Sequence, residues 1–195
     1  MPSVRAFIAI KLPELTRRAI GDQQARLARY PAAHAARWTP PENIHLTLKF
    51  LGDVPSGRLP AIEKSLRATT HAHRVFNLRI SGLGCFPNVR RPRIVWVGVG
   101  GDTEQLLSLQ RDIAVGMAEL GWPQESRTWS PHLTVGRARK TATTGDIVSL
   151  GELFEGTHVG EIARLDITSV SLIKSDLLPG GPIYTDLACA ALPPR

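Results

Sequence analysis

The segments H-L-T-L (residues 45–48) and H-L-T-V (residues 132–135) repeat one pattern in the two halves of a 195-residue chain. Each copy lies in a short apolar run entered through proline, a pattern typical of a β-strand. Side chains two positions apart on a strand point to the same face. The histidine and threonine of each copy are therefore predicted to share one face, while the apolar residues of the motif point into the core.

The rest of the chain divides into strands and helices in a similar order in each half. Hydrophobic periodicity and proline or glycine boundaries place these elements. In the first half we expect a strand over 4–12, a helix over 14–30, a loop over 31–42, the motif strand over 44–51, a helix over 55–70 and a strand over 75–83. In the second half we expect a strand over 93–99, a helix over 102–120, the motif strand over 132–137, a polar stretch over 140–145 leading into a short apolar segment, and strands near 157–163, 166–174 and 183–190.

This order amounts to a weak internal duplication: strand, helix, histidine-bearing strand, then a further helix and strand. No Gly/Ser-rich or Pro-rich linker separates the halves. We therefore expect a single α+β domain over residues 1–195, in which the halves pack as two lobes that share a cleft. If a pseudo-two-fold axis relates the lobes, the two motifs face each other across that cleft.

Composition narrows the functional classes. Lys and Arg number 24 against 17 Asp and Glu, and the net charge of +7 favours polyanionic partners such as RNA or phosphate esters. The two cysteines, Cys85 and Cys189, match no disulfide framework or metal motif. The N-terminal apolar run is stopped by Lys11 and Pro13, which makes it too short for a signal peptide or a membrane span. We expect a cytoplasmic monomer with no membrane and no metal partner.

The two motifs supply the groups that phosphodiester cleavage needs. A neutral imidazole can accept a proton from the attacking oxygen while an imidazolium protonates the leaving oxygen, and a histidine pKa near 6.5 lets both forms coexist near neutral pH. The hydroxyls of Thr47 and Thr134 can donate to the non-bridging oxygens. Lys49 is expected to continue the first polar face, and Arg137 closes the second motif. Such a site requires no cofactor.

The same residues also fit a non-catalytic module that binds RNA or phosphate through its H-x-T strands. Basic residues follow the second motif: Arg139 and Lys140 lie just past the predicted strand. A phosphate backbone would pass this point, so we expect Arg139 and Lys140 to contact RNA, and Lys49 to contact RNA or the reacting phosphate.

A few other residues carry weaker signals. His71 and His73 have the spacing of two metal ligands, but no further His, Cys or acidic cluster lies near them, and a solvated turn is favoured. Trp96 is expected in the core because valines flank it. Trp38 and Trp129 lie just before the two motifs, where either can form the floor of the groove.

Several stretches together resemble a known family. Besides the two motifs, the chain contains R-A-F-I-A-I (5–10), G-C-F-P (84–87), R-P-R-I-V-W-V-G-V (91–99) and P-G-G-P-I-Y (179–184). The set covers nearly the whole chain in order. It resembles the RNA 2′,3′-cyclic phosphodiesterases, also called 2′–5′ RNA ligases, of the 2H phosphoesterase superfamily.

The resemblance implies a bilobal α+β fold in which each lobe is an antiparallel sheet with helices on its outer face and H-x-T-x strands line the central cleft. It implies hydrolysis of RNA 2′,3′-cyclic phosphate ends to 2′-phosphates without a metal, and the second family name adds ATP-independent 2′–5′ RNA ligation. Carried over by motif, His45 is the proton donor to the departing 3′ oxygen and His132 is the base that activates water. Thr47, Thr134 and Arg137 hold the phosphate.

Overall fold

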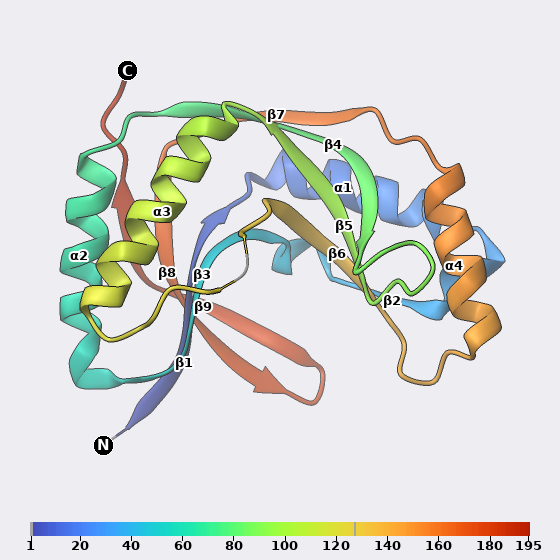
Figure 1. Cartoon of the computed structure of the whole chain (residues 1–195), viewed down its shortest axis with the longest axis horizontal. Coiled ribbons are helices and arrows are strands. Elements are labelled where there is room, and N and C mark those ends of the chain that lie inside the picture. Colours follow the sequence, from blue (N-terminus) through green and yellow to red (C-terminus); the bar gives the residue numbers. More distant parts are fainter. Residues whose placement is uncertain (1, 127) are drawn as a thin grey trace.

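The fold is α+β, with two antiparallel sheets set between helices, as the sequence predicts. The structure is a computed structural model that describes residues 2–126 and 128–195. Helices α2 (Leu59–His71) and α3 (Thr103–Glu119) lie at one end of the molecule, and α1 (Glu14–Leu27) and α4 (Thr144–Gly156) lie towards the other, with the strands between them (Figure 1). None of the helices in the described part of the chain combines the length and apolarity needed to cross a bilayer.

The first sheet has the strand order β3-β1-β8-β9. Its strands are β1 (Ser3–Lys11), β3 (His45–Pro55), β8 (Ser169–Leu178) and β9 (Gly181–Ala191). Helix α3 packs against β3, and α2 packs against β8 and β9. On the face away from these helices, Phe7, Ala9 and Ile173 form a small separate apolar cluster, and Tyr184 packs against it. We call the helix-free face of each sheet its inner face.

The second sheet has the strand order β2-β6-β5-β4-β7. Its strands are β2 (Ala36–Trp38), β4 (Phe76–Phe86), β5 (Ile94–Gly101), β6 (His132–Ala138) and β7 (Glu161–Ile167). Helix α1 packs against β7, and α4 packs against β4. Apart from the added edge strand β2, this sheet repeats the plan of the first.

Each sheet is assembled from both halves of the chain. The histidine strand pairs with the first strand of its own half, and that strand pairs with one from the other half, which gives β3-β1-β8 and β6-β5-β4. The helices cross over as well: α1 follows β1 but packs on the second sheet, and α3 follows β5 but packs on the first. The two lobes are real, but the expectation that each is one half of the sequence is wrong, because the halves exchange helices and strands around one continuous core.

The apolar residues of the motifs anchor both histidine strands in this core. Leu46 and Leu48 are 2% and 1% exposed, and Leu133 and Val135 are 0% and 1% exposed. Burying such a side chain stabilises the fold by roughly 1.5–3 kcal/mol. A slip of one residue would expose all four and bury the histidines, so this burial determines which motif residues lie on the inner faces.

Three segments differ most from the sequence-based expectations. Residues 144–156 form α4 where only a short apolar segment is expected, because the glycines at 145, 151 and 156 obscure the helical pattern. Thr143 and Asp146 form a capping box that starts this helix. The expected loop over 31–42 contains short 3₁₀ turns and β2, and the first motif strand continues through Gly52 to Pro55. Gly52 has a φ of 70°, which lets the strand bend instead of ending there.

Replacing Gly151 with alanine is expected to destabilise the protein. A Cβ at this position would lie 1.8 Å from the carbonyl oxygen of Val89, so α4 or the loop over 87–93 must shift. Overpacking of this kind costs about 1–3 kcal/mol in the free energy of unfolding, which urea denaturation measures. Gly156→Ala, at the end of the same helix, is the matched control: nothing lies within 4 Å of its Cβ position, and its stability is expected to stay the same or rise.

Candidate functional site

Both motif histidines are held in the same way by the carbonyl group two residues earlier. Nδ1 of His45 donates to the carbonyl oxygen of Asn43 at 2.8 Å, and Nδ1 of His132 donates to that of Ser130 at 2.8 Å. A carbonyl oxygen only accepts, so Nδ1 carries the proton and the neutral ring presents its lone pair at Nε2. Each imidazole can therefore accept or deliver a proton at Nε2 without losing its anchor.

Aromatic rings fix the plane of each imidazole. The His45 ring stacks on Phe7 with ring centroids 4.7 Å apart, and Tyr184 meets it edge-on at 5.2 Å. Phe86 meets the His132 ring edge-on at 4.9 Å. Burial lowers the pKa of His45 below its usual value, an effect that the hydrogen bond to Asn43 partly opposes. The His45 ring of the ligand-free protein is therefore biased towards its neutral form.

The two motif strands come together where the sheets meet. Strands β3 and β6 are in contact although they belong to different sheets. Nε1 of Trp129 donates to the carbonyl oxygen of Thr47 at 3.2 Å and so ties the segment before β6 to the first motif. Trp38, the other tryptophan considered for the groove floor, packs against the core.

A β-bulge in β6 brings Arg137 to the inner face. Thr134 and Gly136 pair with adjacent residues of β5, which leaves Val135 without a partner. The extra residue shifts the alternation by one position. Simple alternation from His132 would favour position 136, but the bulge puts Arg137 on the same side as His132 and Thr134.

A matching bulge in β3 has a different consequence. Thr47 and Lys49 pair with adjacent residues of β1, which leaves Leu48 without a partner. Phe50 therefore returns to the inner face, where its side chain is 61% exposed. Phe50 in the first motif strand thus occupies the position that Arg137 holds in the second. Of these two equivalent positions, only the one on β6 carries a cation.

The prediction that Lys49 continues the polar face is wrong. The bulge turns Lys49 away from the inner face, and its side chain is only 4% exposed. Its ammonium group donates to the carbonyl oxygen of Pro123 at 2.7 Å and lies 3.8 Å from a carboxylate oxygen of Glu125. Lys49 therefore holds the segment after α3 and is not available for contact with RNA or phosphate.

Trp96 also lies elsewhere than expected. Its neighbours Val95 and Val97 are 0% and 2% exposed, but Trp96 points to the opposite, inner face. A Cβ at Gly84 on the adjacent strand would be 2.4 Å from its indole, so glycine is required beneath the ring. The Phe86 ring lies 5.4 Å from that of Trp96. Trp96 and Phe86 thus form the aromatic wall on the His132 side of the site.

Sequence reasoning missed two arginines of the inner faces, Arg5 and Arg37. Arg5 lies on the same face of β1 as Phe7, a position that simple alternation could have found. Arg37 lies directly opposite Arg137 in the β2–β6 pair, and both are exposed. Locating Arg37 required β2, which no hydrophobic pattern revealed. Phe50 is one of the aromatic residues that the sequence offers for stacking on a base, but placing it on the inner face required the bulge.

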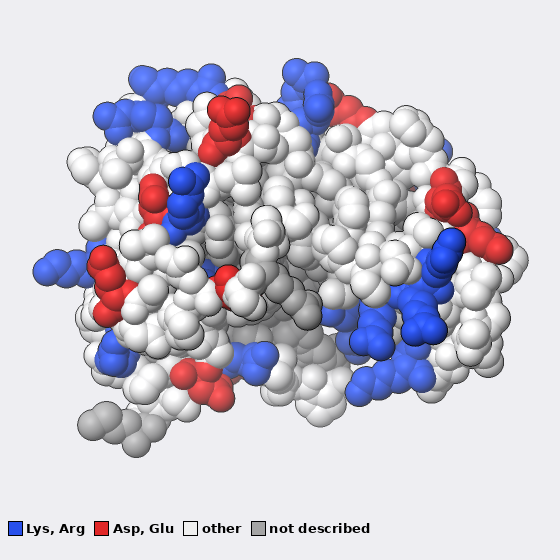
Figure 2. Space-filling model, in the orientation of Figure 1, with Lys and Arg blue, Asp and Glu red and all other residues white. Residues whose placement is uncertain are grey.

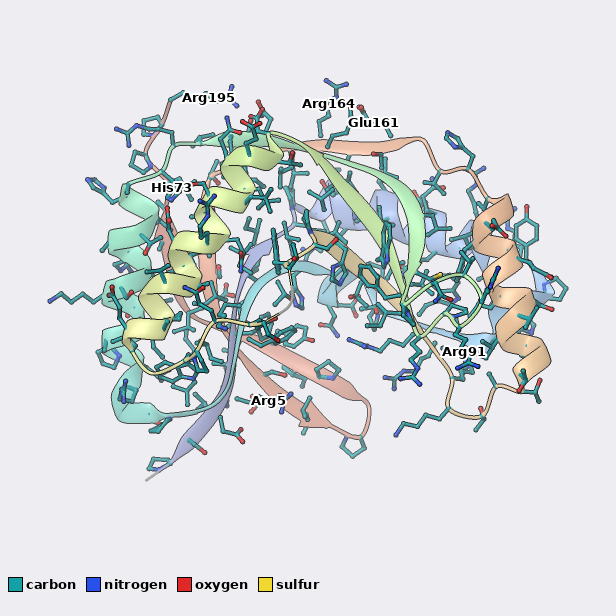
Figure 3. All side chains as sticks on the ribbon, in the orientation of Figure 1. Arg5, His73, Arg91, Glu161, Arg164 and Arg195 are labelled. Carbon is teal, nitrogen blue, oxygen red and sulfur yellow. The ribbon has the colours of Figure 1, made fainter. Side chains whose placement is uncertain are left out.

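Arg139 and Lys140 lie where the sequence places them, exposed just beyond β6. The backbone of Ala138 donates to the carbonyl oxygen of Arg93, so this segment adjoins the basic stretch over 90–93. Lys and Arg gather at the lower right of the face drawn in Figure 2, near the position of Arg91 in Figure 3. Nε of Arg139 also donates to the carbonyl oxygen of His34 at 3.0 Å, which orients its side chain.

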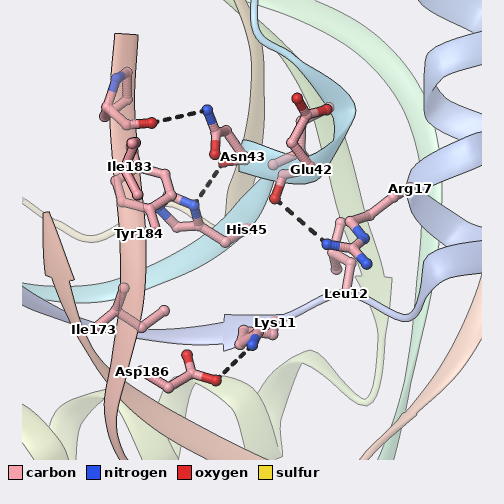
Figure 4. Close-up of a pocket in the computed structure, with 12 residues that line it drawn as sticks. Lys11, Leu12, Arg17, Glu42, Asn43, His45, Ile173, Ile183, Tyr184 and Asp186 are labelled. Carbon is pink, nitrogen blue, oxygen red and sulfur yellow. Dashed lines mark hydrogen bonds and ion pairs between the residues drawn. The ribbon is translucent and has the colours of Figure 1, made fainter. Parts of the chain in front are cut away.

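A pocket of about 380 Å³ adjoins His45 (Figure 4). Tyr184 and Ile183 of β9 form one side, and Nδ2 of Asn43 donates to the carbonyl oxygen of Pro182 at 3.2 Å. The Lys11–Asp186 ion pair, with 2.6 Å between nitrogen and oxygen, closes the opposite end. The pocket is large enough for part of a nucleotide and joins the inner face beside the His45 ring.

Within residues 2–126 and 128–195, no three His, Cys, Asp or Glu side chains are close enough to hold a metal ion together. Nε2 of His73 is 2.9 Å from a carboxylate oxygen of Asp112, so this histidine pairs with α3. Cys85 is buried, and burial raises the pKa of its thiol. Within the described residues, the two motif histidines and their neighbours are therefore the candidate active site.

Comparison with known proteins identifies a set of related sequences. Residues 10–96 match the family described as LigT-like phosphoesterase, a range that includes the first motif. A Methanothermobacter thermautotrophicus protein named RNA 2′,3′-cyclic phosphodiesterase is 39% identical over 184 residues, which cover 94% of this chain and 96% of that protein. An Aquifex aeolicus protein of the same name is 31% identical, with 95% of each chain covered.

Solved structures share the fold over almost the whole chain. A protein from Thermus thermophilus superposes with a TM-score of 0.80 at 26% identity, covering 98% of this chain and 99% of that one. Escherichia coli LigT in complex with 3′-AMP superposes with a TM-score of 0.75 at 27% identity, with the same coverage. The similarity therefore includes both sheets and both motifs.

Proposed function

The chain belongs to the LigT-like phosphoesterase family, and from that premise we propose that it hydrolyses 2′,3′-cyclic phosphate ends of RNA to 2′-phosphates. Water attacks the phosphorus, the bond from phosphorus to the 3′ oxygen breaks, and one proton moves from the water to the base while another moves from the acid to the 3′ oxygen. The observation that carries this proposal is the matched anchoring of the two rings, which leaves Nε2 of each free for proton transfer.

The roles of the two histidines are part of the proposal. We assign His132 as the base that takes a proton from water and His45 as the acid that protonates the departing 3′ oxygen. Each transfer can contribute about 10²–10⁴-fold to the rate. After turnover His132 is protonated and His45 is neutral, so His132 must release one proton to solvent and His45 must take one up before the next cycle.

The phosphate is proposed to bind between the two motif strands. Thr47 and Thr134 lie on the same inner faces as the histidines and can donate to the non-bridging oxygens, where charge grows in the transition state. Arg137 adds a planar pair of donors that suits a phosphate. Arg139 and Lys140, together with the basic stretch over 90–93, provide a path for the RNA strand leading away from the site.

The deciding test offers the protein a short RNA ending in a 2′,3′-cyclic phosphate, in buffer containing EDTA, and follows loss of the cyclic end. The rate of turnover is expected to equal the rate in the same buffer without EDTA. If the protein is instead a module that binds phosphate without cleaving it, we expect salt-sensitive binding and an unchanged substrate. Joining of two RNA ends in the same mixture would show that the site also carries out 2′–5′ ligation.

The pH dependence should differ between free and substrate-bound protein. Above the pKa of His45 the acid has lost its proton and the rate falls. Burial lowers the pKa of His45 in the free protein, whereas a bound phosphate anion stabilises the imidazolium and raises it. The alkaline limb of the profile of kcat is therefore expected at higher pH than that of kcat/KM. Coincident alkaline limbs would contradict the assignment of His45 as the acid.

We also propose that the chain acts as a single domain, is a monomer and is located in the cytoplasm. These three points stay predictions. Because each sheet contributes one histidine and the halves exchange elements, we expect the chain to work as one unit without a second copy. Analytical ultracentrifugation across the concentrations used for assays tests this, with a single species of monomer mass and concentration-independent specific activity as the expected result.

A further inference from the structure

The charges of two arginines, Arg5 and Arg137, act on Tyr184, and neither arginine forms an ion pair in the described part of the chain. Ser175 of β8 pairs with Tyr184 of β9, and the β1–β8 pairing ends at Ala6 and Lys174, so Arg5 and Ser175 are the next residues along these two strands. Ser175 is small and 8% exposed, so the longer side chains on either side of it can approach each other over it. In Figure 3 Arg5 lies between β1 and the β8–β9 hairpin.

The charge of a second arginine, Arg137 of the other sheet, also acts on Tyr184. Burial raises the pKa of Tyr184, and the positive charges of Arg137 and Arg5 offset part of this rise, so the hydroxyl keeps its proton and can donate. Arg37 lies directly opposite Arg137 on β2. Like charges placed opposite each other on neighbouring strands destabilise a sheet unless something compensates them.

No carboxylate of the described residues supplies that compensation. The ion pairs formed within residues 2–126 and 128–195 involve none of Arg5, Arg37 and Arg137. Asp53 lies opposite Arg5 in the β1–β3 register and is the nearest acidic neighbour along that pair, but it is exposed and forms no ion pair with Arg5 in this part of the chain. Arginines that form no ion pair, together with a hydroxyl donor, are groups that can bind an anion.

We propose that Arg5 and the Tyr184 hydroxyl form a second phosphate subsite, which binds the phosphate on the 5′ side of the terminal nucleotide. This inference rests on the proposed function, because it takes the reacting phosphate to lie between the two histidines. Tyr184 connects the two places: its ring contacts the His45 ring, and the charges of Arg5 and Arg137 both act on its hydroxyl. Consecutive phosphates of one RNA strand can therefore reach both. The subsite makes the protein prefer an oligonucleotide end to a free cyclic mononucleotide.

Three substrates that differ by one group test this directly: adenosine 2′,3′-cyclic phosphate, the same nucleotide with a 5′-phosphate, and the dinucleotide ApA with a terminal cyclic phosphate. The wild-type protein is expected to have a higher kcat/KM on the second and third than on the first. Arg5→Ala should lower kcat/KM about tenfold on those two, as expected for the loss of a charged hydrogen bond, and leave the first within about twofold. Tyr184→Phe, which keeps the ring contacts, should show the same selectivity with a smaller loss.

Arg164→Ala is the matched control, since it removes one positive charge at an exposed arginine of the edge strand β7, which is paired with Glu161 and lies on the opposite side of the view from Arg5 (Figure 3). It is expected to leave all three substrates unchanged. An equal loss on all three substrates in Arg5→Ala would place Arg5 at the reacting phosphate, and no loss on any would remove it from binding; both results overturn the proposal. If the wild-type protein cleaves none of the three, the proposed function itself fails, a result distinct from either.

Discussion

Replacing His132 with alanine is expected to lower kcat on cyclic phosphate ends by about 10²–10⁴-fold. The variant loses the group that accepts the proton of water, while the phosphate contacts of the threonines and Arg137 remain. KM should change little, because the lost interaction is formed mainly in the transition state. Steady-state kinetics on a cyclic mononucleotide, with the unfolding midpoint measured in parallel, separates a catalytic loss from a folding defect.

His45→Ala is the companion variant, and its loss should be of similar size but different in pH dependence. It should lose the alkaline limb that the acid imposes, whereas His132→Ala should lose the acid limb that the base imposes. The two rings are held alike by Nδ1 hydrogen bonds, so either substitution perturbs the backbone to a similar degree. Activity within about threefold of the wild type in either variant would remove that histidine from the mechanism.

Arg137→Ala is expected to lower kcat/KM by about 10²-fold, because it removes a charged donor from the reacting phosphate. Arg137→Lys should recover only part of this loss, since an ammonium keeps the charge but not the planar pair of donors. Arg164→Ala again serves as the control for net charge. Full recovery by lysine would show that Arg137 acts through charge alone, and an unchanged kcat/KM in Arg137→Ala would show that it does not touch the phosphate.

Much of this site follows from alternation along two strands. A histidine and a threonine two residues apart must share a face, and the buried leucines between them decide which face it is. The resemblance to a known family places Arg137 at the phosphate, but alternation alone would have favoured position 136. The bulge at Val135 reconciles the two, and the same irregularity at Leu48 is the reason that alternation misplaces Lys49.

Other features depend on contacts distant in the sequence. The exchange of α1 and α3 between the sheets leaves no mark on local periodicity, because either sheet offers an apolar face for the helix to cover. Helix α4 contains three glycines, and its capping box, rather than a hydrophobic pattern, is its sequence signal. For Trp96, too, the local sequence is not enough: the flanking valines indicate a strand but not which of its faces is buried. The glycine beneath the indole explains why that ring can lie on the inner face.

The central claim is that two histidines on different sheets move protons at opposite ends of a cyclic phosphodiester. Phosphorus NMR of adenosine 2′,3′-cyclic phosphate hydrolysed in oxygen-18-labelled water with EDTA tests it most directly, because it reports which bond breaks and where the water oxygen goes. The account predicts the 2′-phosphate as the sole enzymatic product, with one labelled oxygen on phosphorus. A 3′-phosphate product would reverse the leaving group assigned to His45 and contradict the account.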